Sequence, residues 1–402
     1  MSLDAPACRG ADAQQPDQTA PLASPSPRGG GTFAALRDRN YRPYAGGAFV
    51  SNIGTWMQRV AQDWLVLELS GGSGLAVGIT TACQFLPMLL LTSYGGLVAD
   101  RFPKRRVLAL TQAWLALSAA GLGLLAVGGA ASTWHVYLLA LVFGIGTAFD
   151  NPARQAFVPE LVPGDRLQNA IALNSATFHA ARIVGPALAG LTIAAFGTGW
   201  AILGNAVSYA AFVVALGRLD RDGLRPSEPA ARAKGQIREG MRYLRQRRDL
   251  LLVLVVVFCV GTFGMNFQLT SALMAQQEFG RGAQEYGILG SFMAVGSLAG
   301  ALTAARRRKA PSGLYLVMMA AGFAVVEVVA GLMPTYAGYA AVLPILGLAA
   351  LLTLTASNAA LQLTVDPMLR GRVMALYATV LMGGTPIGSP LLGWVGEAFG
   401  PR

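Results

Sequence analysis

Five polar side chains interrupt an otherwise apolar stretch near the start of the chain: Asn52, Thr55, Arg59, Gln62 and Asp63. Residues three and four positions apart share one face of a helix, so these side chains form a single stripe. Arg59 and Asp63 are four residues apart and can pair. A carboxyl group beside a cation in apolar surroundings can take up a proton and exchange its partner. The stripe therefore predicts proton-exchange chemistry, while a purely structural ion pair explains the same spacing.

A second polar stripe lies within residues 168–195, where Ser175, His179 and Arg182 share a helical face. Ionisable groups inside a bilayer cost at least about 2.5 kcal/mol each on insertion scales, so they face water or one another rather than lipid. We expect both stripes to face a water-filled cavity, with Thr262 and Asn266 on its opposite wall.

These polar positions fall into two expected roles. Asp63 is expected to carry a coupling proton, and Arg59 and Arg182 to tune its pairing. The side chains expected to line the cavity and contact a small molecule are Asn52, Gln62, His179 and Asn266.

The composition shows which elements must hold these stripes. Of 402 residues, 54% are hydrophobic and only 13% are charged, and the mean hydropathy is +0.49. Soluble domains carry about 25% charged residues. Apolar runs of roughly 20 residues recur, each long enough to cross a bilayer. Each span must be helical because lipid offers the backbone no hydrogen-bond partner. The sequence therefore predicts an all-α membrane protein.

The apolar runs predict eleven spans, at 44–68, 76–99, 107–128, 134–152, 168–195, 198–217, 249–275, 284–304, 313–332, 337–361 and 371–395. They divide the chain into a disordered tail (1–40), a first bundle (41–217), a basic linker (218–248) and a second bundle (249–402). In the linker, Met241 and Leu244 recur at helical spacing among arginines. This pattern fits either an amphipathic helix on the inner leaflet or a solvated connector.

The positive charges are distributed unevenly among the loops. The segments before the first span and after the second, fourth, sixth, eighth and tenth spans carry most of the Lys and Arg, whereas the opposite loops hold only Arg281. Cytoplasmic loops carry this excess in membrane proteins. The net charge of +11 therefore reports topology rather than nucleic-acid binding, and it predicts a cytoplasmic N-terminus.

The two bundles contain similar segments at corresponding positions. Residues 151–155 (NPARQ) resemble 358–362 (NAALQ), and 185–190 (GPALAG) resemble 389–393 (SPLLG). Parallel repeats of this kind are typical of secondary transporters. The first bundle continues into a sixth span after Phe196-Gly197, whereas the chain stops at Arg402, so the last span expected from the repeat is missing.

The loop after the second span resembles the signature loop of the major facilitator superfamily, with Pro103 where that family usually has glycine. The matching residues are Gly96, Asp100, Arg101, Lys104 and Arg105. More narrowly, the segments 54–58 and 150–155 resemble a bacterial exporter branch that includes the enterobactin exporter. This resemblance implies a two-bundle transporter in the bacterial inner membrane.

In that superfamily the loop acts as a cytoplasmic gate, and the resemblance implies the same here. Asp100 would accept hydrogen bonds from a helix N-terminus and pair with Arg101 or Arg154. Simple anchoring of the topology is the alternative. Gly185, Pro186 and Gly190 resemble the family's exporter motif, although tight helix packing explains small residues and a proline equally well.

The sequence also limits the energy source and chemistry. It has no Gly-Lys dipeptide and hence no nucleotide-binding P-loop, and its three cysteines have no metal-ligand spacing. We expect a monomeric transporter, not an enzyme, that needs no metal or cofactor and exports a small, partly apolar molecule (a siderophore, drug or metabolite) by proton antiport. Proton-coupled uptake and a non-transporting scaffold or sensor are the alternatives.

Overall fold

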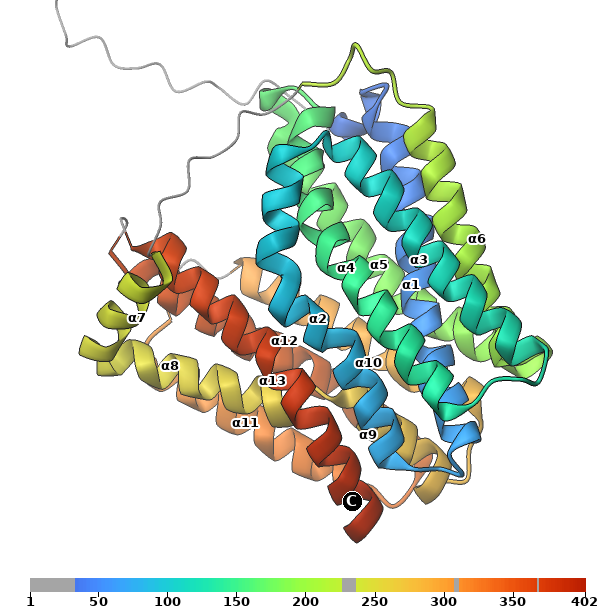
Figure 1. Ribbon diagram of the computed structural model, residues 1–402. Coiled ribbons are helices and arrows are strands. Elements are labelled where there is room, and N and C mark those ends of the chain that lie inside the picture. The colour runs from blue at the N-terminus through green and yellow to red at the C-terminus, as the bar shows by residue number, and fades with distance from the viewer. Residues whose placement is uncertain (1–32, 226–235, 307–310, 367–368) are drawn as a thin grey trace, which may run out of the picture.

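The computed structural model describes residues 33–225, 236–306, 311–366 and 369–402. Helices account for almost all of these residues (Figure 1). The first group contains α1 (Tyr41–Leu69), α2 (Gly74–Arg101), α3 (Lys104–Val127), α4 (Thr133–Leu161), α5 (Gly164–Phe196) and α6 (Thr198–Gly217). The second contains α7 (Gln236–Gln246), α8 (Arg248–Cys259), α9 (Phe267–Leu273), α10 (Ala283–Arg306), α11 (Gly313–Gly331), α12 (Tyr336–Thr364) and α13 (Arg370–Phe399).

Nine helical segments within the described ranges are long and apolar enough to cross a membrane. They are α2 to α6, the segment Asp249–Glu278, and α10 to α12. The more polar α1 and α13 contain 29 and 30 residues and pack among these segments. Each of the eleven predicted spans therefore corresponds to a helical segment, and the all-α membrane architecture is confirmed.

Local sequence fixes where several helices begin and end. Ser73, Ser312 and Thr335 each accept a hydrogen bond from a backbone N–H in the first turn of α2, α11 and α12, respectively. Between α5 and α6, Gly197 has φ +89°. Residues other than glycine rarely adopt this conformation, and it leaves Gly197 as the single residue between α5 and α6.

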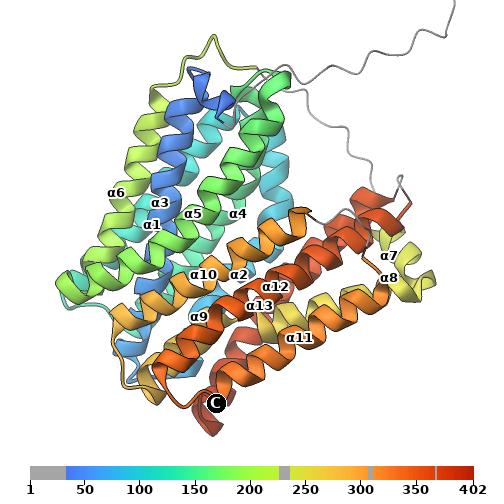
Figure 2. The ribbon, with the colours of Figure 1, turned by 180° about the vertical axis from the view of Figure 1, so that it is seen from behind.

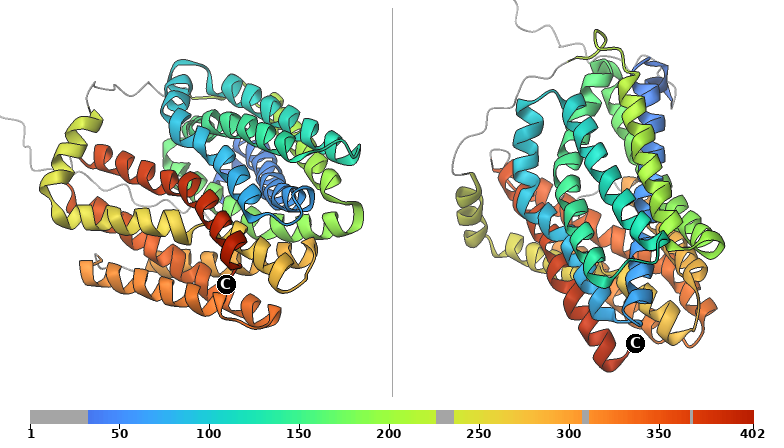
Figure 3. Two further views of the ribbon diagram at one scale, coloured as in Figure 1. Left: turned by 60° about the horizontal axis from the view of Figure 1, so that its bottom comes forward. Right: turned by 45° about the vertical axis from the view of Figure 1, so that its right-hand side comes forward.

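The helices form two bundles that meet through two pairs of helices. Within the first bundle α1 packs on α5 and α6, and α2 on α4; within the second α10 and α11 pack on α12. Between the bundles α2 lies along α13 (Figure 1) and α5 lies along α10 (Figure 2). Figure 3 shows the two bundles side by side from two further directions.

The bundles are joined at one end and diverge toward the other (Figures 1 and 2). At the joined end, Ser73 Oγ donates to Glu397 Oε2 (2.6 Å) and Gln277 Nε2 donates to the Gly72 carbonyl (2.7 Å). The diverging end carries α7 and the arginine-rich loops. The interface between the two bundles is therefore closed at one end and open at the other.

Two details of the predicted tail and linker differ from the prediction or add to it. The predicted tail (1–40) has residues 1–32 outside the described part of the chain, but Ala34–Arg37 forms a short 3₁₀ helix whose Ala35 N–H donates to Asn169 Oδ1. In the linker, α7 is helical and its Leu244 is buried against α8 and α13. Residues 226–235 lie outside the description.

The seventh predicted span is interrupted rather than continuous. It consists of α8, a π-helical turn at Val260–Gly264, α9 and a second π-helical turn at Met274–Glu278. A β-carbon on Gly264 would lie 2.3 Å from the Phe323 ring, so the close approach of α11 requires glycine at this turn. Such turns often mark functional sites, and Met265 and Asn266, which follow this one, line the cavity described below.

Candidate functional site

A cavity of about 420 Å³ lies between the bundles. Both bundles contribute to its wall, mainly α1, α2, α4 and α5 from the first and the α8–α9 segment, α10 and α13 from the second. The apolar part of the lining includes Trp56, Phe85, Phe178, Phe267 and Met293. A mostly apolar pocket of this size with a few polar groups suits a small organic molecule.

Two of the four predicted contact residues line this cavity. Asn52 and Asn266 are in its wall, on opposite bundles. Asn266 follows the π-helical turn and donates from Nδ2 to the Thr262 carbonyl (2.7 Å), while its buried Oδ1 has no hydrogen-bond partner. An unpartnered amide oxygen at the cavity wall is suited to accept a hydrogen bond from a bound molecule.

The other two predicted contact residues, Gln62 and His179, are not among the side chains that line this cavity. Gln62 is buried, with 1% of its surface exposed, and is absent from the cavity wall. His179 contacts its neighbour Phe178 edge-on, and Phe178 rather than His179 lines the cavity. Phe178 and His179 lie four and three residues before Arg182, so both belong to its broad face, but as neighbours they point about 100° apart around the helix.

Asp63 is buried and bonded across the bundle interface. The Tyr286 hydroxyl on α10 donates to Asp63 Oδ2 on α1 at 3.1 Å. The predicted ion pair with Arg59 is not formed, since Arg59 instead stacks over the rings of Trp56 and Phe85. Tyr286 thus occupies the position that the spacing assigned to Arg59, because the arginine side chain extends into the cavity.

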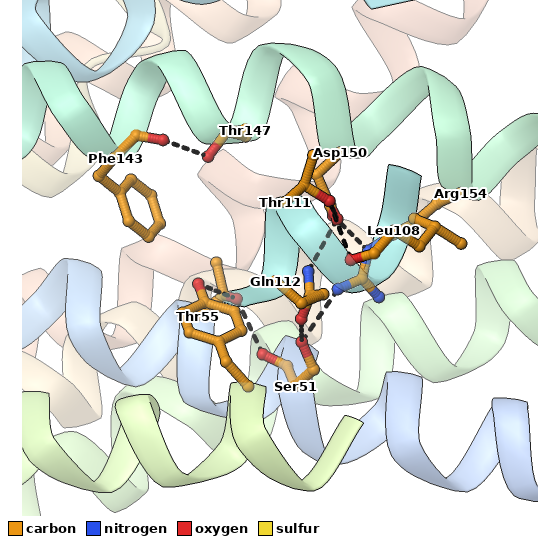
Figure 4. A network of polar contacts seen from close by, with 10 residues as sticks. Ser51, Thr55, Leu108, Thr111, Gln112, Phe143, Thr147, Asp150 and Arg154 are labelled. Carbon is orange, nitrogen blue, oxygen red and sulfur yellow. Dashed lines mark hydrogen bonds and ion pairs between the residues drawn. The ribbon is translucent and has the colours of Figure 1, made fainter. Parts of the chain in front are cut away.

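A second buried acid, not selected from the sequence, lies on α4 (Figure 4). Asp150 pairs with Arg154 (Nε to Oδ2, 2.5 Å) and accepts hydrogen bonds from Thr111 and Gln112 on α3, each at 2.8 Å. Arg154 also donates to Ser51 on α1 (3.0 Å). The network ties α1, α3 and α4 together. Its sequence signal is an acid and an arginine four residues apart in an apolar segment, as at Arg59 and Asp63 but in the opposite order.

The predicted gate residues lie at the diverging end of the interface, around the α2–α3 loop. Either Arg101 or Arg154 was expected to pair with Asp100, and the carboxylate that pairs with Arg154 is Asp150. Lys104 binds Glu160 at the end of α4 (2.6 Å), and both side chains are largely buried. This pair holds the loop against the first bundle.

The other members of the predicted gate have separate positions. Arg105 donates to the carbonyls of Leu216 and Gly217 (2.7 and 2.9 Å), and so caps the C-terminal end of α6. Gly96 and Arg101 are in the last two turns of α2. None of these contacts joins the bundles, which is consistent with the open end of the interface.

The predicted exporter motif forms a close helix contact. A β-carbon on Gly185 would lie 2.5 Å from the Trp56 side chain, and one on Gly190 would lie 2.8 Å from the Gln284 carbonyl of α10. A β-carbon on Gly287 of α10 would in turn meet the Pro186 carbonyl at 2.3 Å. Gly185, Pro186 and Gly190 therefore bring α5 against α1 and α10.

Residues 30–401 match the family described as transmembrane secretion effectors of the major facilitator type. The chain belongs to this family. Its members are membrane transporters rather than enzymes, so the chain is a multi-pass transporter of the bacterial inner membrane.

Several characterised and uncharacterised proteins resemble it. The uncharacterized MFS-type transporter YfiS of Bacillus subtilis is 28% identical over 294 residues, 72% of this chain and 68% of YfiS. The multidrug efflux pump Tap of Mycolicibacterium fortuitum is 27% identical over 372 residues, 88% of each chain. The enterobactin exporter EntS of Shigella boydii is 25% identical over 335 residues, 82% of this chain and 77% of EntS.

Solved structures agree on the fold. A bacterial homologue of the iron transporter ferroportin, in an inward-facing state, superposes with a TM-score of 0.69 at 16% identity and covers 89% of this chain and 93% of its own. A bacterial homologue of the lysosomal transporter Spinster, also inward-facing, gives 0.68 at 17% identity, covering 90% and 82%. The two-bundle transporter fold is therefore confirmed.

Proposed function

We propose that this transporter exports a small, partly apolar molecule from the cytoplasm by alternating access, in exchange for protons. Residues 41–217 and 249–402 act as the two moving units, and 218–248 connects them. The cavity between the bundles would hold the substrate, and a single chain encloses it, so a monomer suffices. Siderophores, drugs and other metabolites are the candidate classes, because relatives include an enterobactin exporter and a multidrug efflux pump.

The hydrogen bond from Tyr286 to Asp63 carries the proposal of proton coupling. It joins α1 to α10, so the charge on this carboxyl group bears directly on how the bundles hold together. A charged carboxylate accepts this bond more strongly than a neutral acid does. A proton taken up by Asp63 would weaken the contact and favour separation of the bundles at this level. Arg59 and Arg182 line the neighbouring cavity and would tune the exchange.

Loop charge and the contacts between the bundles together support a direction of access for this proposal. If the arginine-rich loops are cytoplasmic, the N-terminus is also cytoplasmic and the joined end faces outward. The structure then corresponds to an inward-facing state. In the opposite state the α2–α3 loop, with Gly96, Asp100, Arg101, Lys104 and Arg105, would close the cytoplasmic end, as the resemblance implies.

Proton flux in inside-out membrane vesicles tests this proposal. Vesicles acidified by respiration and containing the wild-type protein should lose their proton gradient when a compound from a siderophore and antibiotic library is transported. The Asp63→Asn variant should give no such loss, and Tyr286→Phe should give a reduced one. Equal flux in wild type and Asp63→Asn would remove Asp63 from the coupling step. Uptake by intact cells, rather than depletion, would favour proton symport instead.

A further inference from the structure

Two arginine side chains in the cavity stack on the same indole ring. The guanidinium carbon of Arg59, on α1, lies 4.8 Å from the Trp56 ring centre, and that of Arg182, on α5, lies 5.3 Å from it. Arg59 also lies over the Phe85 ring at 5.2 Å. All four side chains line the cavity. The two cations are thus held by aromatic faces of the first bundle.

Neither guanidinium is neutralised within the described part of the chain. No carboxylate lies within ion-pairing distance of Arg59 or Arg182, and the buried Nε of Arg59 has no hydrogen-bond partner. Asp150 is the one acid in the described cavity wall, and it is already paired with Arg154. The cavity wall therefore has two guanidinium groups without a directly paired carboxylate, and Asp63 acts on Arg59 only from beyond ion-pairing distance.

Aromatic faces attract a cation but leave its N–H groups without acceptors. A guanidinium presents its donors in a plane that matches the two oxygens of a carboxylate. Buried charges are otherwise paired, because an unpaired buried charge is costly. An anion placed between the two arginines would satisfy both groups at once.

We propose that Arg59 and Arg182 form the recognition site for an organic carboxylate that also has an aromatic or apolar body. The carboxylate binds between the two guanidinium groups, and the apolar body lies among Trp56, Phe85 and Phe178. This inference takes the cavity as the transport site of the proposed function and names its substrate class. Arg59 and Arg182 are specificity residues in this account, in addition to any influence on Asp63.

Binding of three probes with the same ring system and different charge tests this assignment. The probes are 1-naphthoate, 1-naphthalenemethanol and 1-naphthylmethylammonium, titrated calorimetrically into the full-length protein in lipid nanodiscs. Wild type should bind the carboxylate at least tenfold more tightly than the other two. Arg59→Gln and Arg182→Gln should each weaken naphthoate binding about tenfold, or about 1.4 kcal/mol, and leave the alcohol unchanged.

Arg281→Gln is the matched control. Arg281 also stacks on an aromatic ring, that of Tyr336 at 5.8 Å, but it is exposed and outside the cavity wall. This variant should bind all three probes like wild type. The assignment is overturned if wild type shows no preference for the carboxylate, binds none of the probes, or prefers the ammonium compound. It is also overturned if both cavity variants retain the wild-type preference.

The wild-type comparison needs no substitution, so it decides the question even where a variant fails to fold. Binding is measured without a proton gradient. Loss of proton coupling in the vesicle assay would therefore leave this inference standing, and a missing carboxylate preference would leave export of a neutral or cationic molecule intact.

Discussion

The contact between α2 and α13 makes Gly78→Ala the most informative single substitution. A β-carbon on Gly78 would lie 2.3 Å from the Ser389 carbonyl oxygen and 2.8 Å from the Pro390 α-carbon. Both are backbone atoms, so no side-chain rotation relieves the clash. The Ser389 hydroxyl also donates to the Gly78 carbonyl at 3.1 Å, which shows how closely the helices approach.

An ordinary contact begins at 3.4 Å, so alanine would force the two helices about 1 Å apart. Overpacking of this kind costs about 1–3 kcal/mol. We expect the cost to fall on the state whose joined end is closed, because in this state Gly78 lies directly against the Ser389 carbonyl. The ratio of closed to open molecules should then fall by roughly 5- to 150-fold.

Spin-label distance measurements can follow this shift in nanodiscs. Labels at Ala130 and Leu332, which are exposed in outer-end loops of opposite bundles, would report opening in a protein whose native cysteines are replaced. Wild type should give mainly the short distance, and Gly78→Ala mainly a longer one.

Gly144→Ala provides the matched control. Its β-carbon would meet the Gln84 carbonyl at 2.4 Å, a comparable clash within the first bundle. This variant should lower thermal stability without changing the distance distribution. If Gly78→Ala behaves in the same way as Gly144→Ala, the α2–α13 contact does not distinguish transport states and the reasoning is refuted.

Two further substitutions test the ion pair and the outer contact. Asp150→Asn should lower the free energy of unfolding by about 3–5 kcal/mol, because it leaves the Arg154 charge buried without its partner. Thermal unfolding in detergent would show this loss. The control Glu278→Gln breaks the more exposed pair with Arg402 and should lower the free energy of unfolding by less than about 1 kcal/mol. Glu397→Ala removes the acceptor of hydrogen bonds from Ser73 Oγ and the Leu75 N–H, and should raise the outer-open population a few-fold in the same distance measurement. An unchanged distance distribution would show that this contact is incidental.

Sequence alone predicted the architecture because apolar run length and loop charge are local properties. Each of the eleven predicted spans corresponds to a helical segment. The interruption after Cys259 could not be predicted, since it depends on how closely Phe323 of α11 approaches Gly264. A continuous apolar run gives no sign of such a neighbour.

The candidate site was predicted less completely, for a similar reason. Helical spacing placed Asn52 and Arg59 on the cavity side correctly, but a stripe is too broad to separate Phe178 from His179. Asp63 has its partner 223 residues away in Tyr286, and no local pattern contains that information. Asp150 lies four residues before Arg154, within a segment that was interpreted only as a family resemblance.

Labelling of a cysteine at position 52 by a membrane-impermeant thiol reagent tests whether the cavity opens to the cytoplasm. The test uses Asn52→Cys in a protein without native cysteines, because Asn52 lines the cavity between the bundles. We expect rapid labelling in inside-out vesicles and protection in right-side-out vesicles. Labelling from the outer face alone, or from neither face, would contradict a cavity that opens to the cytoplasm in this state.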